Sequence, residues 1–248
     1  MFGQSETNVL VAGHRGYKAL YPENTMISFK KAIEIGVDMI EMDLNVTADR
    51  QLVIIHDTTL DRTTNGNGKV RDFTLKEIKS LDAGIFKGEE FAGERVPEFS
   101  EFLDLVSKEE NLYLNVEIKD RTFEAVDLTI KALDEYNMLD KIVITCFDAS
   151  IVRYANEKYG VKTQGFPSWY VSNFDEHTYR HVYAVGIHMK DLSRALCIDF
   201  RSRGIDPWGY CPDTDEMVYK AIESKCSLVT CNNPEPALRI LREKGLHK

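Results

Sequence analysis

The chain has 248 residues, of which 43% are hydrophobic and 29% charged, and its formal net charge is −9. Such a composition is typical of a globular protein, and this length can bury a large core without disulfides. The acidic balance argues against binding to nucleic acid or to anionic membranes. It still permits a small anionic substrate, because a metal or a few basic residues can reverse the local field.

The cysteines and the N-terminus indicate the compartment. All five cysteines lie in the C-terminal half, and no two have the CxxC spacing of a structural zinc site. Their odd number predicts buried thiols in a reducing compartment and not a disulfide framework. The first residues lack the pattern of a secretory signal, and no window approaches 18 apolar residues. We therefore expect a cytoplasmic protein with no transmembrane segment.

The N-terminal part predicts two strands joined by a helix. The apolar run at 8–13 indicates a buried strand. The motif Pro22-Glu23-Asn24-Thr25 marks a helix start with Asn24 or Thr25 as the cap, and Gly36 marks its end. A second strand is expected at 38–44, and a hairpin follows it at 46–57.

The segment 58–97 differs from its surroundings. Its run Thr63-Thr64-Asn65-Gly66-Asn67-Gly68 is typical of turns, and more glycines recur after it. We predict one short helix there, at 75–80. We interpret the segment as an inserted subdomain within a single domain that spans residues 1–248.

A regular alternation of helix and strand begins at residue 100. The expected helices lie at 100–109, 122–137, 148–159, 174–182, 191–203, 214–224 and 234–244. The expected strands lie at 112–117, 141–146, 161–166, 183–188, 204–208 and 227–231. With the N-terminal strands these make eight strand–helix units, which predict a (β/α)₈ TIM barrel with a small insertion after strand 2. A doubly wound open sheet is the alternative.

Polar residues of unusual types fall near the carboxyl ends of these strands, where a barrel collects its functional loops. Two histidines, two basic residues, three acids and a tryptophan stand out: His14, His56, Arg15, Lys119, Glu41, Asp43, Glu117 and Trp208. One end of the barrel is therefore the expected site.

The acids predict a metal site. Glu41 and Asp43 are two residues apart on a strand, so both side chains point to the same face. Two neighbouring carboxylates repel each other unless they share a cation, and Glu117 from the next barrel strand completes a set of three. Hard oxygen ligands favour one divalent cation, Mg²⁺ or Ca²⁺. In the alternative, each acid pairs with a base such as Arg15 or Lys119.

The other residues suit the cleavage of a phosphodiester. His14 and His56 can give and take protons near neutral pH. The planar fork of Arg15 matches phosphate oxygens, and Lys119 adds a point charge. Trp208 could present a flat apolar wall to a substrate. The remaining histidines are not grouped with the acids at the expected site, and we expect them to be structural or solvated: His177, His181, His188 and His247.

Taken together, these motifs resemble the glycerophosphodiester phosphodiesterase family. The matching segments are His14-Arg15-Gly16, Pro22-Glu23-Asn24-Thr25, Glu41-x-Asp43, His56-Asp57-x-Thr59-Leu60-x-Arg62-Thr63-Thr64-x-Gly66-x-Gly68, Glu117-x-Lys119 and Trp208. Their order and spacing agree over nearly the whole chain, so the likeness does not depend on one short pattern.

The resemblance implies a function. It implies a TIM barrel that hydrolyses glycerophosphodiesters to glycerol 3-phosphate and an alcohol. By motif, His14 and His56 look like the acid–base pair, and Glu41, Asp43 and Glu117 look like ligands of Mg²⁺ or Ca²⁺. Arg15, Lys119 and Trp208 look like substrate contacts. The alternatives are a lysophospholipase D-like or cyclising phosphodiesterase acting on lysolipids, and a catalytically silent binding module.

The second half of the chain departs from the family pattern. The family often has Ser-Phe where this chain has Cys146-Phe147, and Thr-Val-Asn where it has Gly209-Tyr210-Cys211. The last strand of the family usually ends in Thr-Asp or Thr-Asn before a proline, and here the sequence is Thr230-Cys231-Asn232-Asn233-Pro234. We expect these positions to line the pocket wall and to affect the choice of alcohol more than the chemistry.

Overall fold

Eight parallel strands form a closed barrel in residues 8–247, which are the residues that the computed structural model describes. β1 pairs with β2 on one side and with β9 on the other, which closes the ring. The barrel strands are β1 Leu10–His14, β2 Met39–Val46, β4 Tyr113–Ile118, β5 Ile142–Thr145, β6 Thr163–Gly165, β7 Ala184–His188, β8 Asp206–Tyr210 and β9 Leu228–Cys231. The predicted (β/α)₈ barrel is confirmed, and the open sheet is wrong.

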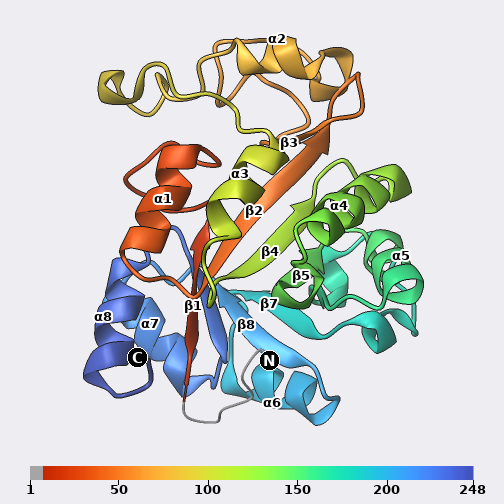
Figure 1. Cartoon of the computed structure of the whole chain (residues 1–248). Helices are drawn as coiled ribbons and strands as arrows, with labels where there is room; N and C mark the ends of the chain where they lie inside the picture. Colours follow the sequence, from red (N-terminus) through yellow and green to blue (C-terminus); the bar gives the residue numbers. More distant parts are fainter. Residues whose placement is uncertain (1–7, 248) are drawn as a thin grey trace.

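Helices surround the barrel (Figure 1), and most of them bury one apolar face against the strands. They are α1 Met26–Glu34, α3 Phe99–Val106, α4 Phe123–Glu135, α5 Ala149–Tyr159, α6 Arg194–Ser202, α7 Asp215–Glu223 and α8 Glu235–Glu243. Local signals fix their ends. Thr25 caps α1 by accepting a hydrogen bond from the backbone N–H of Ser28, so one of the two predicted caps is confirmed.

Two predicted elements are corrected by the structure. The helix expected at 174–182 is only a single 3₁₀ turn, η5 Thr178–His181. The side chain of Asp175 binds the backbone N–H of His177, which competes with helical bonding in a segment too short to nucleate an α-helix. The strand expected at 204–208 is β8, shifted by two residues, because Gly204 adopts a left-handed turn (φ +76°) after α6.

The hairpin and the following insertion form the upper part of Figure 1. β3 Leu52–Ile54 pairs antiparallel with the end of β2, and a turn at 48–50 lies between them, so the predicted hairpin is present. Residues 58–97 contain η1 Val70–Asp72, α2 Leu75–Lys79 and η2 Glu89–Phe91. We propose that they are an inserted subdomain of the single domain, since they share a separate apolar cluster with the hairpin: Val53, Ile55, Leu60, Val70, Ile78, Ala83 and Val96.

None of the helices in residues 8–247 has the length and apolarity needed to cross a bilayer. Residues 1–7, which carry much of the N-terminal stretch used to argue against a secretory signal, lie outside the described residues. The structure therefore bears on the predicted absence of a membrane span only for the described part of the chain.

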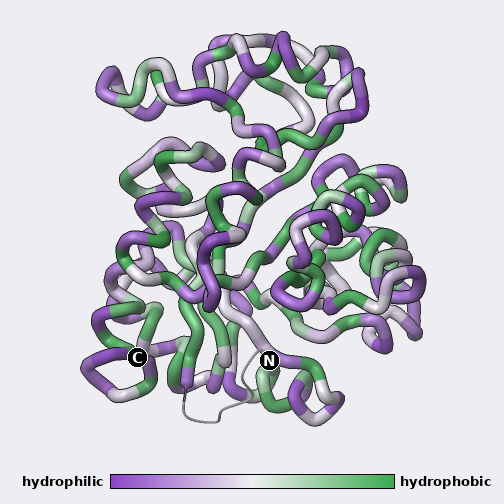
Figure 2. Tube along the Cα trace, viewed as in Figure 1, coloured by the Kyte–Doolittle hydropathy of each residue, from purple (hydrophilic) through white to green (hydrophobic). Residues whose placement is uncertain are grey.

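The main core lies between the strands and the helices, and the central strands are mainly hydrophobic in Figure 2. Phe102 of α3 is fully buried there and packs edge-to-face on Phe29, with ring centroids 4.7 Å apart. We expect Phe102→Ala to lower the free energy of unfolding by about 3–5 kcal/mol, because it leaves a cavity. Ile198→Ala, at a position that is 54% exposed, should change the free energy of unfolding by less than about 0.5 kcal/mol. Urea titration of the wild type and both variants measures these changes.

Candidate active site

The turn after β1 is tied to β2 and to α1. Arg15 and Gly16 both have positive φ angles, +54° and +79°. A side chain on Gly16 would collide with the backbone of Ser28, so this close approach requires glycine. The Ser28 hydroxyl donates to the Arg15 carbonyl (3.0 Å), and the Arg15 backbone N–H donates to Glu41 Oε2 (2.9 Å). These contacts fix Arg15 and the preceding His14 at the rim.

The three acids lie together below this turn. Glu41 and Asp43 occupy the same face of β2, and Asp43 is opposite Glu117 of β4 in the parallel register. β2 continues to Val46 because its end pairs with β3, so these acids lie within the strand and not at its predicted end. Each acid offers an oxygen, and these three oxygens lie within 4.8 Å of one another.

This arrangement fits a hard divalent cation. All three acids are buried, and Asp43 Oδ1 accepts no hydrogen bond. Burial and the neighbouring Asp43 raise the pKa of Glu41 well above its usual value, and burial also raises the pKa of Glu117. A shared cation would offset both the desolvation and the repulsion. The described residues contain no other such group of three or more possible ligands.

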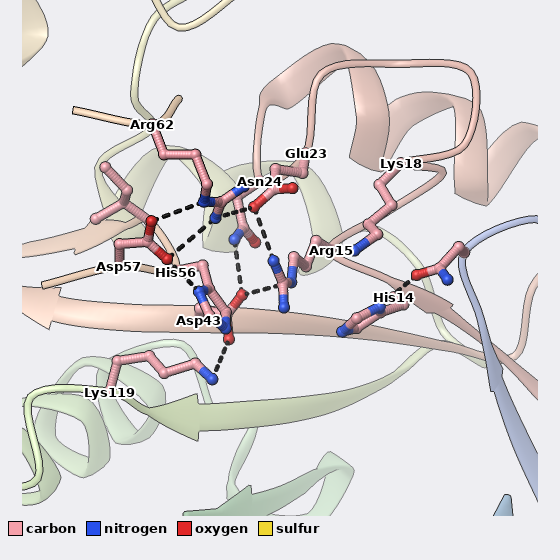
Figure 3. A network of polar contacts seen from close by, with 12 residues as sticks. His14, Arg15, Lys18, Glu23, Asn24, Asp43, His56, Asp57, Arg62 and Lys119 are labelled. Carbon is pink, nitrogen blue, oxygen red and sulfur yellow. Dashed lines mark hydrogen bonds and ion pairs between the residues drawn. The ribbon is translucent and has the colours of Figure 1, made fainter. Parts of the chain in front are cut away.

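Two basic residues already contact these acids. Arg15 Nε lies 3.2 Å from Asp43 Oδ2, and Lys119 Nζ lies 3.3 Å from Asp43 Oδ1 (Figure 3). Lys119 Nζ also lies 2.5 Å from Glu117 Oε1. Burial alone would raise the pKa of Asp43, but Lys119 and Arg15 outweigh it and lower the pKa to about 2. The pairing that the sequence left as an alternative is thus present, within the set of acids that fits a metal.

His14 is held at its Nδ1 by the far end of the chain. Its Nδ1 lies 2.6 Å from Asn232 Oδ1, and the amide group of Asn232 donates in turn to Asp213 Oδ2 (2.6 Å). Because that amide must present its oxygen to the ring, His14 donates from Nδ1 and keeps Nε2 for other partners. Burial, assisted by the charge of Arg15, lowers the pKa of His14 to about 3, so the ring is neutral.

His56 follows β3 and is held in the same way. Its Nδ1 lies 2.5 Å from Asp57 Oδ1, which leaves Nε2 as its second nitrogen. Burial lowers the pKa of His56, with Lys119 and Arg15 adding to the shift and Asp43 opposing it. Both histidines line one cavity of about 200 Å³ at the carboxyl end of the barrel.

That cavity brings together nearly all the predicted residues. Asp43 is fully buried beneath it, and the others line it: His14, Arg15, Glu41, His56, Glu117, Lys119 and Trp208. Of the positions where the chain departs from the family pattern, Gly209 and Tyr210 also line it, together with Phe147 and Thr230, which match the pattern. The departing cysteines, expected at the pocket wall, are not among the lining residues: Cys146, Cys211 and Cys231. Phe166 stacks on Phe147 (centroids 3.7 Å apart) and meets Tyr210 edge-on, which gives one side an aromatic surface.

Trp208 lies deeper than expected. The shift of β8 places it in the middle of the strand, where it is 3% exposed and Tyr210 takes the strand end. Its indole Nε1–H donates to Asp206 Oδ2 (3.0 Å), and its ring meets Tyr183 edge-on. Trp208 therefore contributes to the floor of the cavity, and the aromatic side wall comes from other residues.

Several residues that hold the site in place were not predicted from the sequence to belong to it. Asn24 donates its amide to Asp43 Oδ2 (2.8 Å), and its backbone φ of +56° is one that asparagine tolerates. Glu23, Asp57 and Arg62 link the two sides of the rim (Figure 3). Their place inside the family motifs was the available signal, but no local pattern predicted which partner each would contact.

Comparisons with known proteins identify the family of this chain. The model of the glycerophosphoryl diester phosphodiesterase family matches residues 14–235. A glycerophosphodiester phosphodiesterase of Caldanaerobacter subterraneus subsp. tengcongensis is 35% identical over 246 residues, which cover 95% of this chain and 99% of that protein.

Solved structures show the same fold. A protein of Silicibacter pomeroyi, described as a putative glycerophosphoryl diester phosphodiesterase, has a TM-score of 0.86 at 22% identity, covering 97% of this chain and 95% of that one. An Oleispira antarctica phosphodiesterase, solved in complex with the product sn-glycerol-3-phosphate, also has a TM-score of 0.86, at 23% identity, covering 94% of this chain and 96% of that one. The chain belongs to the glycerophosphodiester phosphodiesterase family and is a phosphoric diester hydrolase.

Proposed function

We propose that this enzyme hydrolyses glycerophosphodiesters to glycerol 3-phosphate and an alcohol, with a divalent cation and two histidines. The observation that supports this best is the gathering of three buried acids, two histidines and two basic side chains at one cavity. When bound by Glu41, Asp43 and Glu117, Mg²⁺ or Ca²⁺ would neutralise the phosphodiester and the charge that builds up during cleavage.

In this mechanism the histidines transfer the protons. His14 and His56 each have Nδ1 engaged by a protein oxygen, so each offers Nε2 to a substrate in the cavity. One ring is neutral and takes the proton of the attacking hydroxyl on Nε2. The other enters in its doubly protonated form and gives its Nε2 proton to the leaving alkoxide, and both rings return to their starting states by exchanging a proton with solvent. The attacking group is water or the neighbouring glycerol hydroxyl, and the second would give a cyclic phosphate first.

The basic residues bind the phosphate. Arg15 and Lys119 line the cavity and contact Asp43, so their charges already lie beside the proposed metal ligands. A phosphodiester that enters can accept hydrogen bonds from both. Trp208 would form the floor beneath the substrate. The complex of the Oleispira antarctica protein with sn-glycerol-3-phosphate supports this product.

The test is an activity screen that identifies the broken bond. We expect glycerophosphocholine, glycerophosphoethanolamine and glycerophosphoglycerol to yield glycerol 3-phosphate in the presence of Mg²⁺, Ca²⁺ or Mn²⁺. A coupled dehydrogenase assay measures the product, and ³¹P NMR distinguishes it from phosphocholine and from a cyclic phosphate. Phosphocholine with free glycerol as the products would contradict the proposal, because the other ester bond would have been cleaved.

Three exposed apolar side chains favour lysolipids as a second class of substrate. Leu20 is 53% exposed, and Ile85 and Phe86 of the insertion are 38% and 63% exposed. Lys87 donates to the backbone carbonyl of Ala19 (2.8 Å), so the two loops that carry these residues touch. Turnover of lysophosphatidylcholine faster than glycerophosphocholine would support this alternative. The silent binding module is not retained, because no predicted catalytic group is missing.

We further propose that the enzyme acts in the cytoplasm. All five cysteines are free, and four of them are buried. This state is consistent with the reducing compartment predicted from the sequence. Detection of the tagged protein in a cytosolic fraction, and not in a secreted or membrane fraction, would test the proposal.

A further inference from the structure

Two residues of the family motifs, Glu23 and Arg62, contact each other at the rim of the cavity and have no role in the mechanism above. Glu23 lies in the turn before α1, and Arg62 lies in the insertion that follows β3. Arg62 binds Asp57 through two nitrogens (Nε to Oδ2 2.7 Å, NH2 to Oδ1 3.1 Å). Its NH2 also donates to Glu23 Oε1 at 2.8 Å. The Arg62 guanidinium therefore joins two carboxylates from different parts of the chain (Figure 3).

Each of these carboxylates in turn holds a residue of the proposed mechanism. Asp57 Oδ1 lies 2.5 Å from His56 Nδ1, and Glu23 Oε1 accepts a hydrogen bond from Arg15 NH1 at 2.8 Å. Arg62 is thus connected to His56, a proposed proton-transfer group, through Asp57, and to Arg15, a proposed phosphate contact, through Glu23. It does not line the cavity itself, so any effect on catalysis acts through its neighbours.

The charges of this network remain fixed over the pH range in which enzymes work. Hydrogen bonds from Arg62 lower the pKa of Asp57 to about 2. Burial would raise the pKa of Glu23, but Arg62 and Arg15 outweigh it and lower the pKa to about 2. An ionised Asp57 can only accept a hydrogen bond, so His56 must carry its proton on Nδ1 and leave Nε2 for the substrate.

We propose that Arg62 is a positioning residue of this enzyme. Through Asp57 it fixes the tautomer and the orientation of the His56 ring, and through Glu23 it fixes the guanidinium of Arg15. The inference rests on the proposed function for the roles of His56 and Arg15. It also gives the insertion a part in the chemistry, since Arg62 is the residue by which the insertion reaches the rim network.

The geometry demands arginine at this position. One planar guanidinium binds both oxygens of Asp57 and one oxygen of Glu23 at the same time. A lysine carries a single nitrogen and cannot reproduce the fork. Because the Arg62 side chain is 47% exposed, its ion pairs add little to stability, and variants at this position should fold.

The first test compares kinetics. We expect Arg62→Ala to lower kcat about 10–100-fold, the range for loss of a partner that orients a catalytic ligand. Arg62→Lys should be similarly impaired, and added guanidinium ion should restore part of the Arg62→Ala activity. Glu23→Gln should raise KM more than it lowers kcat, because it releases Arg15 and leaves Asp57 in place. Arg95→Ala is the matched control, since Arg95 is an exposed arginine of the insertion that donates to the Ser80 carbonyl.

The second test does not depend on activity. Nitrogen-15 NMR of the Ca²⁺-loaded protein reports which ring nitrogen of each histidine carries the proton. We expect His56 to be protonated on Nδ1 in the wild type. In Arg62→Ala it should shift toward the Nε2–H form, because Asp57 stays ionised but loses the two hydrogen bonds that orient its carboxylate toward the ring. His14 is the internal reference, because its Nδ1 partner is Asn232, and its signals should stay unchanged.

The outcomes separate this inference from the proposed function. Arg62→Ala with an unchanged His56 tautomer overturns the inference, whether its activity is normal or low. A shifted tautomer in a protein that releases no glycerol 3-phosphate overturns the proposed function and leaves the positioning role supported. A shifted tautomer together with lower kcat and rescue by guanidinium supports both.

Discussion

His56→Ala and His14→Ala are each expected to lower kcat for glycerophosphocholine hydrolysis by about 10²–10⁴-fold, the usual contribution of one positioned acid or base. KM should change little, because the proposed phosphate contacts Arg15 and Lys119 and the three proposed metal ligands remain. Both side chains are partly exposed at the rim, so their removal should leave the core packing intact. Initial rates of glycerol 3-phosphate release, with the thermal midpoint as a check on folding, measure the effect.

His177→Ala provides the matched control for both variants. Its side chain is 48% exposed and contacts Glu176, and it belongs to the histidines expected to be structural or solvated. Its kcat should equal that of the wild type. An enzyme that keeps more than half of its kcat without either His14 or His56 would contradict the acid–base assignment.

Removal of divalent cations is expected to abolish activity, and addition of Mg²⁺ or Ca²⁺ should restore it. Asp43→Asn should lose activity even with excess metal, because Asp43 belongs to the group of three acids and also contacts both basic residues. Metal should also stabilise the folded wild type, by about 2.7 kcal/mol at a concentration of 100 Kd. Calorimetric titration and the thermal midpoint, each with and without metal, give readouts independent of turnover.

Glu216→Gln serves as the control for removal of an acid, since Glu216 is exposed in the first turn of α7. It should bind metal and turn over substrate like the wild type. Full activity in the presence of chelator, after the metal content has been shown to be negligible, would refute the requirement for a metal.

Much of the site could be predicted because it is encoded in spacing along single strands. Glu41 and Asp43 share a face since side chains alternate along a strand, and Glu117 joins them because β4 is the neighbour of β2. The barrel follows from the regular alternation of strands and helices and from the preference for right-handed crossovers. Residues at the carboxyl ends of such strands then meet without further information.

The rest depends on contacts between distant segments or on shifts of a few residues. The depth of Trp208 changed because Gly204 ends the preceding turn and delays β8 by two residues. The partner of His14 is Asn232, 218 positions away, and no periodic pattern encodes such a pairing. The bond from Arg62 to Glu23 likewise joins an insertion to a different loop.

The closure of the barrel has a consequence for the making of the enzyme. β1 is synthesised first, yet one of its two neighbours is β9, and the partner of His14 follows directly after β9. During synthesis a domain generally folds as one unit. A nascent chain that stops short of Leu228 holds both histidines and all three acids but lacks the last barrel strand and Asn232. We therefore expect hydrolytic competence to appear only after β9 and Asn232 have been synthesised, in a single late step.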